Sequence, residues 1–483
     1  MLWENLLSLN KYGDTSLRLR KNEDETRLSF DMDYDRVVFS SAFRSLQDKT
    51  QVIPLSKTSF VHTRLTHSIE VSVVGRSLGR AVGKHVLTKY PHLSELGYQT
   101  NDFGAIIAAA AVAHDIGNPP FGHSGEKAIG EFFQFKKGTA IKHLLTEAEY
   151  ADLCSFEGNA NGFRILNETR LGVEGGLRLT YATLGAFTKY PKESLPVRPT
   201  DRIADKKYGF FQGDKKFFKE VAETLGLKSN SVNGELRYAR HPLAFLVEAA
   251  DDICYTIIDF EDGINLGLIS EDVALEYLGG IISDKINTHK YSKLQTKEER
   301  IAYLRAVAIG ALIQDATDIF LQNEDAILAG EFHQSLLYDS KYRHQITDVI
   351  DCSVERIYQS DEVVEKEEDK IDKGYEKYVD SLKLMQELSS KIRKNKIKRG
   401  YIEFLSDEIK ILVDEYGIPY EIHKKEQKTG EKLIEDFMIV ANESVATRIR
   451  DMQLPNIYRI HEKPKIEKIK EFLGYVTSLG YKI

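Results

Sequence analysis

The sequence is poor in cysteine. Its 483 residues contain only Cys154, Cys254 and Cys352, which lie far apart and form no CxxC pair. A disulfide-rich extracellular fold and a thiolate zinc site both need more cysteines at closer spacing. We therefore expect a protein of a reducing compartment, the cytoplasm.

Long apolar runs and an excess of basic charge are also missing. The longest apolar run, Ala105 to Ala113, is too short to cross a bilayer. The first residues, Met1 to Asn5, include an acid and lack the basic-then-apolar order of a signal peptide. The formal net charge of −8 argues against nucleic-acid binding along the whole chain. These absences favour a soluble protein that is not bound to a membrane.

The composition is that of a globular protein, with 42% hydrophobic and 29% charged residues. Helical periodicity dominates, so we predict an all-α fold. We place a catalytic core with an N-terminal arm at residues 1–290 and a charged helical C-terminal region at residues 291–483. Residues 198–237, rich in lysine and aromatics, predict an irregular excursion. One small β-hairpin could form there, because Asn233-Gly234 supplies turn residues.

The most informative feature is the dipeptide His114-Asp115, which follows the apolar run. Adjacent residues at a helix end are about 100° apart around the helix axis, so both side chains can reach one cation. His67 lies on the apolar stripe of an upstream helix, and Asp251 lies on an apolar helix downstream. All four side chains can therefore face one interior.

Each of these residues has a simpler explanation when it is taken alone. His67 could be a core histidine bonded to a carbonyl group, and Asp251 could form a salt bridge with an arginine. Together, two imidazoles and two carboxylates on apolar helices are a ligand set for a divalent metal such as Mn, Fe, Co, Ni or Zn. The combination favours a metal site.

His123 and Glu126, three residues apart, follow the dipeptide closely. This spacing lets a carboxylate orient an imidazole, and histidine is the side chain that titrates nearest to neutral pH. The alternative is that Gly122 to Gly125 is only a turn that leads into a helix. With a metal site nearby, the pair is a candidate for proton transfer.

Several blocks of the sequence resemble HD-domain phosphohydrolases, and in particular the bacterial deoxyguanosinetriphosphate triphosphohydrolases (dGTPases). The blocks occur in the family's order and fall between about residues 10 and 265. They are RSLQDKTQV (44–52), HTRLTHS (62–68), HDIGNPPFGH (114–123), EGNA (157–160), TKYP (188–191) and EAADDICY (248–255).

The resemblance implies a reaction in which water attacks the α-phosphorus of dGTP and releases deoxyguanosine and intact triphosphate. It implies a divalent cation, Mn²⁺, Mg²⁺ or Co²⁺, and catalysis by His123 and Glu126. A divalent cation lowers the pKa of water and neutralises phosphoryl oxygens, which suits this reaction. The implied metal ligands are His67, His114, Asp115 and Asp251.

The resemblance also implies contacts to the substrate. Basic side chains would neutralise the triphosphate. The ring of Tyr255 would lie under the deoxyribose and leave no room for a 2′-hydroxyl; without the resemblance, a half-buried core aromatic explains it equally well. The implied substrate-binding residues are Arg44, Gln51, Arg64, Asn159, Lys189, Tyr190, Tyr255 and Asp259.

Partners are implied as well. The family forms homo-oligomers up to hexamers, and some members respond to single-stranded DNA. Residues 391–399 hold six bases in nine positions and could bind a phosphate backbone, although a solvated surface explains them too. Arg448 and Arg450 are candidates for reading guanine; otherwise they are surface arginines on a helix.

Three other functions remain open. The closest is a dNTP triphosphohydrolase without base preference. Another is an HD enzyme for a different phosphate ester, such as a cyclic dinucleotide, although no GYP tripeptide follows His114-Asp115. The last is a regulatory or nucleic-acid-binding protein with a vestigial site, which predicts that a ligand is missing, whereas all four are present.

Overall fold

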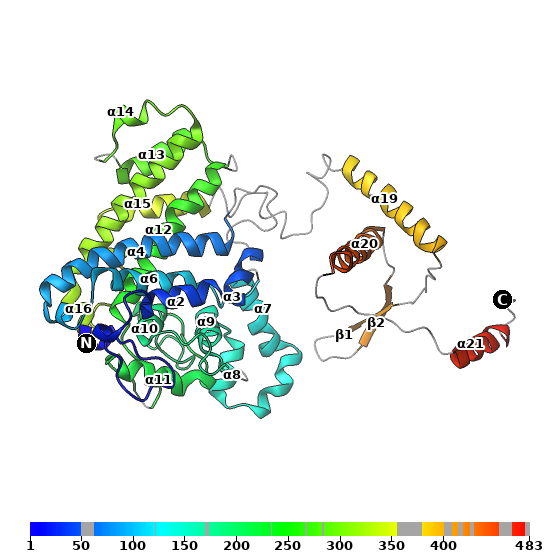
Figure 1. Cartoon of the computed structure of the whole chain (residues 1–483), viewed down its shortest axis with the longest axis horizontal. Coiled ribbons are helices and arrows are strands. Elements are labelled where there is room, and N and C mark those ends of the chain that lie inside the picture. The colour runs from blue at the N-terminus through cyan, green and yellow to red at the C-terminus, as the bar shows by residue number, and fades with distance from the viewer. Residues whose placement is uncertain are drawn as a thin grey trace. The chain divides into compact units, whose positions relative to one another are not determined.

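The computed structural model describes residues 1–49, 62–120, 122–169, 173–232, 234–265, 268–282, 285–354, 379–399, 408–413, 419–425, 429–453 and 466–478. The chain divides into two compact units, Met1–Asp369 and Lys370–Ile483 (Figure 1). The expected boundary at residue 290, where the composition changes, remains a prediction. None of the described helices has the length and apolar character needed to cross a lipid bilayer.

The predicted all-α fold is confirmed, because the described part of the first unit is built from helices. The α-helices are α1 (Trp3–Leu6), α2 (Ser29–Val38), α3 (Ser41–Arg44), α4 (Arg64–Lys89), α5 (His92–Glu95), α6 (Thr100–Ala113), α7 (Gly122–Phe135), α8 (Glu147–Cys154), α9 (Gly158–Asn167), α10 (Tyr181–Phe187), α11 (Lys215–Thr224), α12 (Pro242–Asn265), α13 (Glu271–Ile282), α14 (Thr288–Tyr291), α15 (Lys297–Gln322), α16 (Glu324–Leu328) and α17 (Arg343–Ser353). The 3-10 helices are η1 (Arg20–Asn22), η2 (Ser45–Asp48), η3 (Lys137–Leu144), η4 (Ile203–Asp205), η5 (Gln212–Asp214) and η6 (Leu336–Asp339).

Glycines allow α4 and α6 to pack at short range. Gly75, Gly79 and Gly83 recur every four residues along one side of α4. A Cβ atom at Gly79 would lie 2.6 Å from the carbonyl oxygen of Phe103, and one at Gly83 would lie 2.7 Å from the Phe103 ring. Larger residues at these positions would therefore push the two helices apart.

A third helix joins the pair at Gly75. A Cβ atom there would lie 3.5 Å from the side chain of Ala111 on α6 and 3.6 Å from that of Ala250 on α12. Ala111 lies in the last turn of α6, and Ala250 lies in the middle of α12. The crossing thus brings the first half of α4, the end of α6 and the middle of α12 together in the core (Figure 1).

A histidine between two carboxylates ties the start of α4 to α12. Nδ1 of His62 lies 2.7 Å from Oδ1 of Asp262, and Nε2 lies 3.2 Å from Oε1 of Glu70. The Asp262 carboxylate is fully buried. Burial acts to lower the pKa of His62, but the hydrogen bonds to Asp262 and Glu70 outweigh it and raise the pKa from 6.5 to about 10.

We expect the variant His62→Gln to be less stable than the wild type by about 3 kcal/mol near pH 6, because it leaves the buried Asp262 carboxylate without a cation. The imidazolium contribution is complete below the unfolded-state pKa of 6.5 and is lost as the pH rises toward the folded-state pKa of about 10. Urea unfolding at about pH 6 and about pH 9 should therefore show a smaller difference at the higher pH. A difference that does not change with pH would contradict a charged His62.

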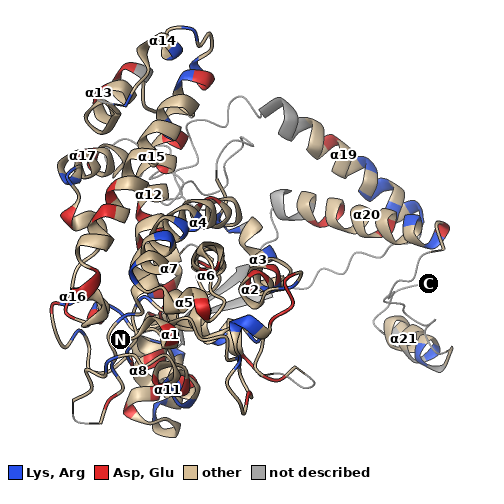
Figure 2. Cartoon of the chain, turned by 60° about the vertical axis from the view of Figure 1, so that its left-hand side comes forward, with Lys and Arg blue, Asp and Glu red and all other residues tan. Residues whose placement is uncertain are grey.

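The second unit contains α19 (Val379–Lys398), α20 (Thr429–Asp451), α21 (Ile466–Ser478) and an antiparallel hairpin of β1 (Glu408–Val413) and β2 (Pro419–Lys425). Basic residues recur along α19 (Figure 2). Two of them, Arg393 and Lys396, contact the buried carboxylate of Asp436 on α20 at 3.1 and 3.4 Å. Part of the basic run therefore holds two helices together.

The hairpin that we predicted near Asn233-Gly234 is present only as a short antiparallel pairing. Asn233 lies outside the described residues, but Ser229 and Tyr238 on either side of it form an antiparallel bridge, with backbone hydrogen bonds of 2.7 and 2.8 Å between the neighbouring residues. A regular sheet of two strands lies at residues 408–425, where β1 is rich in β-branched residues.

Candidate active site

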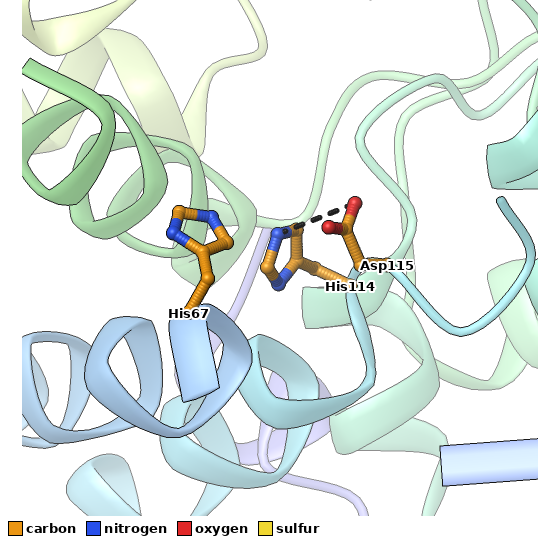
Figure 3. Close-up of side chains that lie close together, drawn as sticks. All are labelled: His67, His114 and Asp115. Atoms are coloured by element: carbon orange, nitrogen blue, oxygen red, sulfur yellow. Dashed lines mark ion pairs between the residues drawn. The ribbon is translucent and has the colours of Figure 1, made fainter. Parts of the chain in front are cut away.

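Two histidines and an aspartate from two helices form the centre of the site. His67 lies in the first turn of α4, and His114 and Asp115 directly follow α6. All three residues are buried, and their potential ligand atoms lie within 4.8 Å of one another (Figure 3). The two imidazole rings meet edge to face, with centroids 5.3 Å apart.

Asp251 reaches the same place from α12. Its Oδ1 atom lies 3.2 Å from Nε2 of His67 and 3.4 Å from Nε2 of His114. The structure thus brings together the four residues that the sequence analysis selected as metal ligands. Imidazole nitrogens and carboxylate oxygens are ligands that divalent first-row metals accept, so this donor set fits such a cation.

The ring of His114 is held by the backbone. Nδ1 lies 2.7 Å from the carbonyl oxygen of Ala111, which can only accept a hydrogen bond. Nδ1 is therefore the donor, and Nε2 is the nitrogen that faces the carboxylates. An outer hydrogen bond of this kind fixes the tautomer and orientation of metal-ligating histidines.

Each carboxylate of the cluster also contacts a basic side chain. Nη1 of Arg64 lies 2.6 Å from Oδ2 of Asp115, and Nζ of Lys189 lies 2.7 Å from Oδ2 of Asp251. Burial acts to raise the pKa of both carboxyl groups. Nearby positive charge outweighs burial and lowers the pKa of both, through His114 and Arg64 at Asp115 and through Lys189 and His114 at Asp251. Both groups are therefore ionised near neutral pH.

The cluster forms one wall of a cleft with a volume of about 450 Å³. This volume lies within the range of ligand pockets. The lining residues that the sequence analysis selected are Arg64, His67, His114, Asp115, His123, Asn159, Lys189, Tyr190, Asp251 and Tyr255; Asn118, Gly122 and Lys207 also line the cleft.

Three selected substrate residues are not among those that line the cleft. Arg44 is exposed at the end of α3, and Asp259 is buried on α12. Gln51 lies outside the described residues. Their contacts to a substrate remain predictions.

His123 and Glu126 form a hydrogen-bonded pair at the start of α7. Nδ1 of His123 lies 2.7 Å from Oε2 of Glu126, and the histidine is 84% exposed whereas the glutamate is 11% exposed. Burial acts to raise the pKa of Glu126, but the hydrogen bond with His123, the charge of Lys207 and the Gly158 amide outweigh it and lower the pKa. An ionised carboxylate thus orients an accessible imidazole.

The other carboxylate oxygen of this pair is held by the start of α9. The amide nitrogen of Gly158 donates to Oε1 of Glu126 at 2.7 Å. A Cβ atom at Gly158 would lie 2.2 Å from Oδ1 of Asn118 and 2.9 Å from Oε1 of Glu126, so only glycine permits this approach. The EGNA block therefore supports the His123–Glu126 pair.

Sequence reasoning missed Lys207. It lies in the irregular stretch 198–237, where neither helical spacing nor a recognised block distinguishes it from other lysines. In the fold it lines the cleft, and its Nζ atom lies 3.1 Å from Oε1 of Glu157. In the sequence, the acidic residue Glu157 of the EGNA block is the signal that could have suggested a nearby cation.

Comparison with known protein families identifies an HD domain at residues 64–154, which contains three of the four cluster residues. A second family model, the RNB domain, matches residues 320–482. The HD match runs from α4 to α8, so it includes the His123–Glu126 pair but not Asp251 on α12.

Similar proteins align over most of the chain. A deoxyguanosinetriphosphate triphosphohydrolase-like protein of Synechocystis sp. is 46% identical over 373 residues, which are 75% of this chain and 82% of the relative. A protein of the same description from Pseudomonas aeruginosa is 40% identical over 70% of this chain and 74% of the relative. A deoxyguanosinetriphosphate triphosphohydrolase of Yersinia pseudotuberculosis is 31% identical over 66% of this chain and 69% of the relative.

Proposed function

Because the chain belongs to the deoxyguanosinetriphosphate triphosphohydrolase family of HD-domain proteins, we propose that it hydrolyses dGTP to deoxyguanosine and triphosphate with the help of a divalent cation. One observation supports this proposal above the others. A single cleft is lined by the His/Asp cluster, by an oriented imidazole and by three basic side chains, Arg64, Lys189 and Lys207.

The cation would be held by His67, His114, Asp115 and Asp251. We propose Mn²⁺, Mg²⁺ or Co²⁺. A divalent cation at this place supplies Lewis-acid chemistry, because it lowers the pKa of water and neutralises charge on a phosphoryl oxygen.

His123 moves a proton in the proposed reaction. A bond forms between a water oxygen and the α-phosphorus, the bond from that phosphorus to the 5′ oxygen breaks, and a proton passes to the 5′ oxygen. Glu126 accepts the hydrogen bond of His123 Nδ1 and so leaves Nε2 for this transfer. Positioned acid–base groups of this kind contribute about 10²- to 10⁴-fold in rate.

The remaining residues of the cleft bind the substrate. Arg64 and Lys189 already contact carboxylates of the cluster, so their charges lie where a triphosphate would meet the cation. Lys207, Asn159 and Tyr190 offer further donors. We propose that Tyr255 lies against the deoxyribose and excludes a 2′-hydroxyl.

Product analysis tests this function. The full chain, loaded with Mn²⁺, is incubated with each of the four dNTPs and with GTP, and the products are separated by anion-exchange chromatography. We expect deoxyguanosine and intact triphosphate from dGTP and no turnover of GTP. The same products from all four dNTPs would indicate a dNTPase of broad specificity instead of a dGTPase. Release of orthophosphate or pyrophosphate would contradict the proposed reaction.

We also propose that the protein is a homo-oligomer, up to a hexamer, and that single-stranded DNA acts as an effector through residues 391–399. Arg393 and Lys396 of this run contact Asp436, which leaves four exposed bases, Lys391, Lys394, Lys398 and Arg399. Lys391 pairs with Glu387 and Arg399 with Glu443. Light scattering measures the subunit number, and dGTP hydrolysis with and without single-stranded DNA measures the effect.

A further inference from the structure

A buried glutamate connects two donors that line the cleft. The side chain of Glu157 is buried and is not itself among the residues that line the cleft. Its Oε1 atom lies 2.6 Å from Nδ2 of Asn159 and 3.1 Å from Nζ of Lys207. Asn159 and Lys207 come from different parts of the chain, and both line the cleft.

We propose that Glu157 is a positioning residue for the hydrolysis, whose carboxylate holds Lys207 and Asn159 together against the polyphosphate of the substrate. This inference rests on the proposed function. A lysine ammonium lies on a flexible four-carbon stem, and holding it in advance reduces the entropy that is lost when the substrate binds. The charge-assisted hydrogen bond to Glu157 supplies that restraint.

The same turn also reaches the proton-transfer pair. Gly158 donates its amide hydrogen to Glu126, and the charge of Lys207 contributes to the lowered pKa of Glu126. A Lys207 that left its place would therefore change both the field at the triphosphate and the field at Glu126. The turn from Glu157 to Asn159 thus couples substrate binding to the orientation of His123.

Glu157 also has a purely structural role, and a test must separate this role from the positioning of Lys207. It is the N-cap residue of α9, and its Oε1 atom accepts a hydrogen bond from the amide of Asn159 at 3.4 Å. Loss of this cap would lower stability without any relation to Lys207. The coupling between Glu157 and Lys207 distinguishes the two roles.

A double-mutant cycle measures this coupling. Glu157→Gln, Lys207→Met and the double variant are prepared as full chains, loaded with Mn²⁺ and assayed with dGTP. Glu157→Gln alone should lower kcat/KM by about tenfold, in line with a hydrogen bond to a charged group. The combined loss should be at least about fivefold smaller than the product of the two single losses. Independent effects, or an unchanged kcat/KM in Glu157→Gln, would overturn the proposal.

Glu193 provides a matched control. It is also buried, and it contacts a lysine and an amide, Lys215 and Gln212, each at 2.8 Å. Neither of these two residues lines the cleft. Glu193→Gln should keep kcat/KM within about twofold of the wild type, because its partners touch no substrate. An equal loss in both variants would point to general destabilisation and overturn the role of Glu157.

A binding experiment tests Glu157 even if dGTP is not the substrate. Inorganic triphosphate is titrated by calorimetry into the Mn²⁺-loaded wild type, Glu157→Gln and Glu193→Gln. We expect the dissociation constant to rise by at least about fivefold in Glu157→Gln only. Equal affinity in all three proteins would overturn the proposal. Absence of dNTP turnover in the wild type would count against the proposed function alone.

Discussion

Replacing His114 with alanine is expected to remove the bound divalent cation and to lower dGTP hydrolysis by at least about 10³-fold. The reason is that a metal supplies several kcal/mol of transition-state stabilisation, and each 1.36 kcal/mol is about tenfold in rate. His114 is buried, and its Nε2 atom faces both carboxylates of the cluster, at 3.5 Å from Asp115 and 3.4 Å from Asp251. Asp251→Ala should behave in the same way.

Metal content and activity are measured on the same samples. Each variant is dialysed against Mn²⁺ and then against buffer, the metal is counted by mass spectrometry, and hydrolysis is assayed with Mn²⁺ present. His92→Ala is a suitable control, since His92 is half exposed on α5 and pairs with Glu4 far from the cluster in sequence. A full complement of Mn²⁺ in His114→Ala would remove His114 from the ligand set.

The second large effect is expected at His123. His123→Ala should retain the cation and lose about 10²- to 10⁴-fold in kcat, because it removes the proton carrier and leaves the buried cluster intact. Glu126→Gln should lose less, about tenfold to 100-fold, since it weakens only the orientation of the imidazole. Because His123 is 84% exposed, His123→Ala should leave the stability of the fold within about 0.5 kcal/mol of the wild type.

Single-turnover kinetics with dGTP separate this effect from changes in product release. His143→Ala, an exposed histidine on η3, serves as the matched control and should keep the wild-type rate. Loss of Mn²⁺ from His123→Ala would place His123 in the metal site rather than in proton transfer. A wild-type rate in the same variant would remove it from the reaction.

The sequence predicted the parts of the site that depend on helical spacing. His67 and Asp251 lie on apolar stripes, so periodicity predicted that both face inward; His67 is buried and Asp251 is partly buried. The spacing of His123 and Glu126 predicted the hydrogen bond that the structure contains. These inferences needed only the geometry of one helix at a time. The same spacing could not give the crossing at Gly75, which depends on which helices pack together.

The features that the sequence analysis missed or predicted only in part lie in irregular segments. Lys207 reaches the cleft because its segment returns to the start of α9, where Glu157 holds it. No local pattern encodes that path, since it depends on contacts between positions fifty residues apart. The pairing beside Asn233-Gly234 is short for a related reason: a turn dipeptide gives no information about how far its flanking segments continue to pair.

The distance along the chain between the parts of the cluster affects how the protein is made. His67 and Asp251 are 184 positions apart in the sequence, and their side chains meet only in the finished fold. At about 5–20 residues per second, the ribosome needs about 10–40 s to add the second after the first. During that interval His67 and His114 are present without Asp251. The proposed binding of a cation by all four side chains must therefore wait for the synthesis of α12.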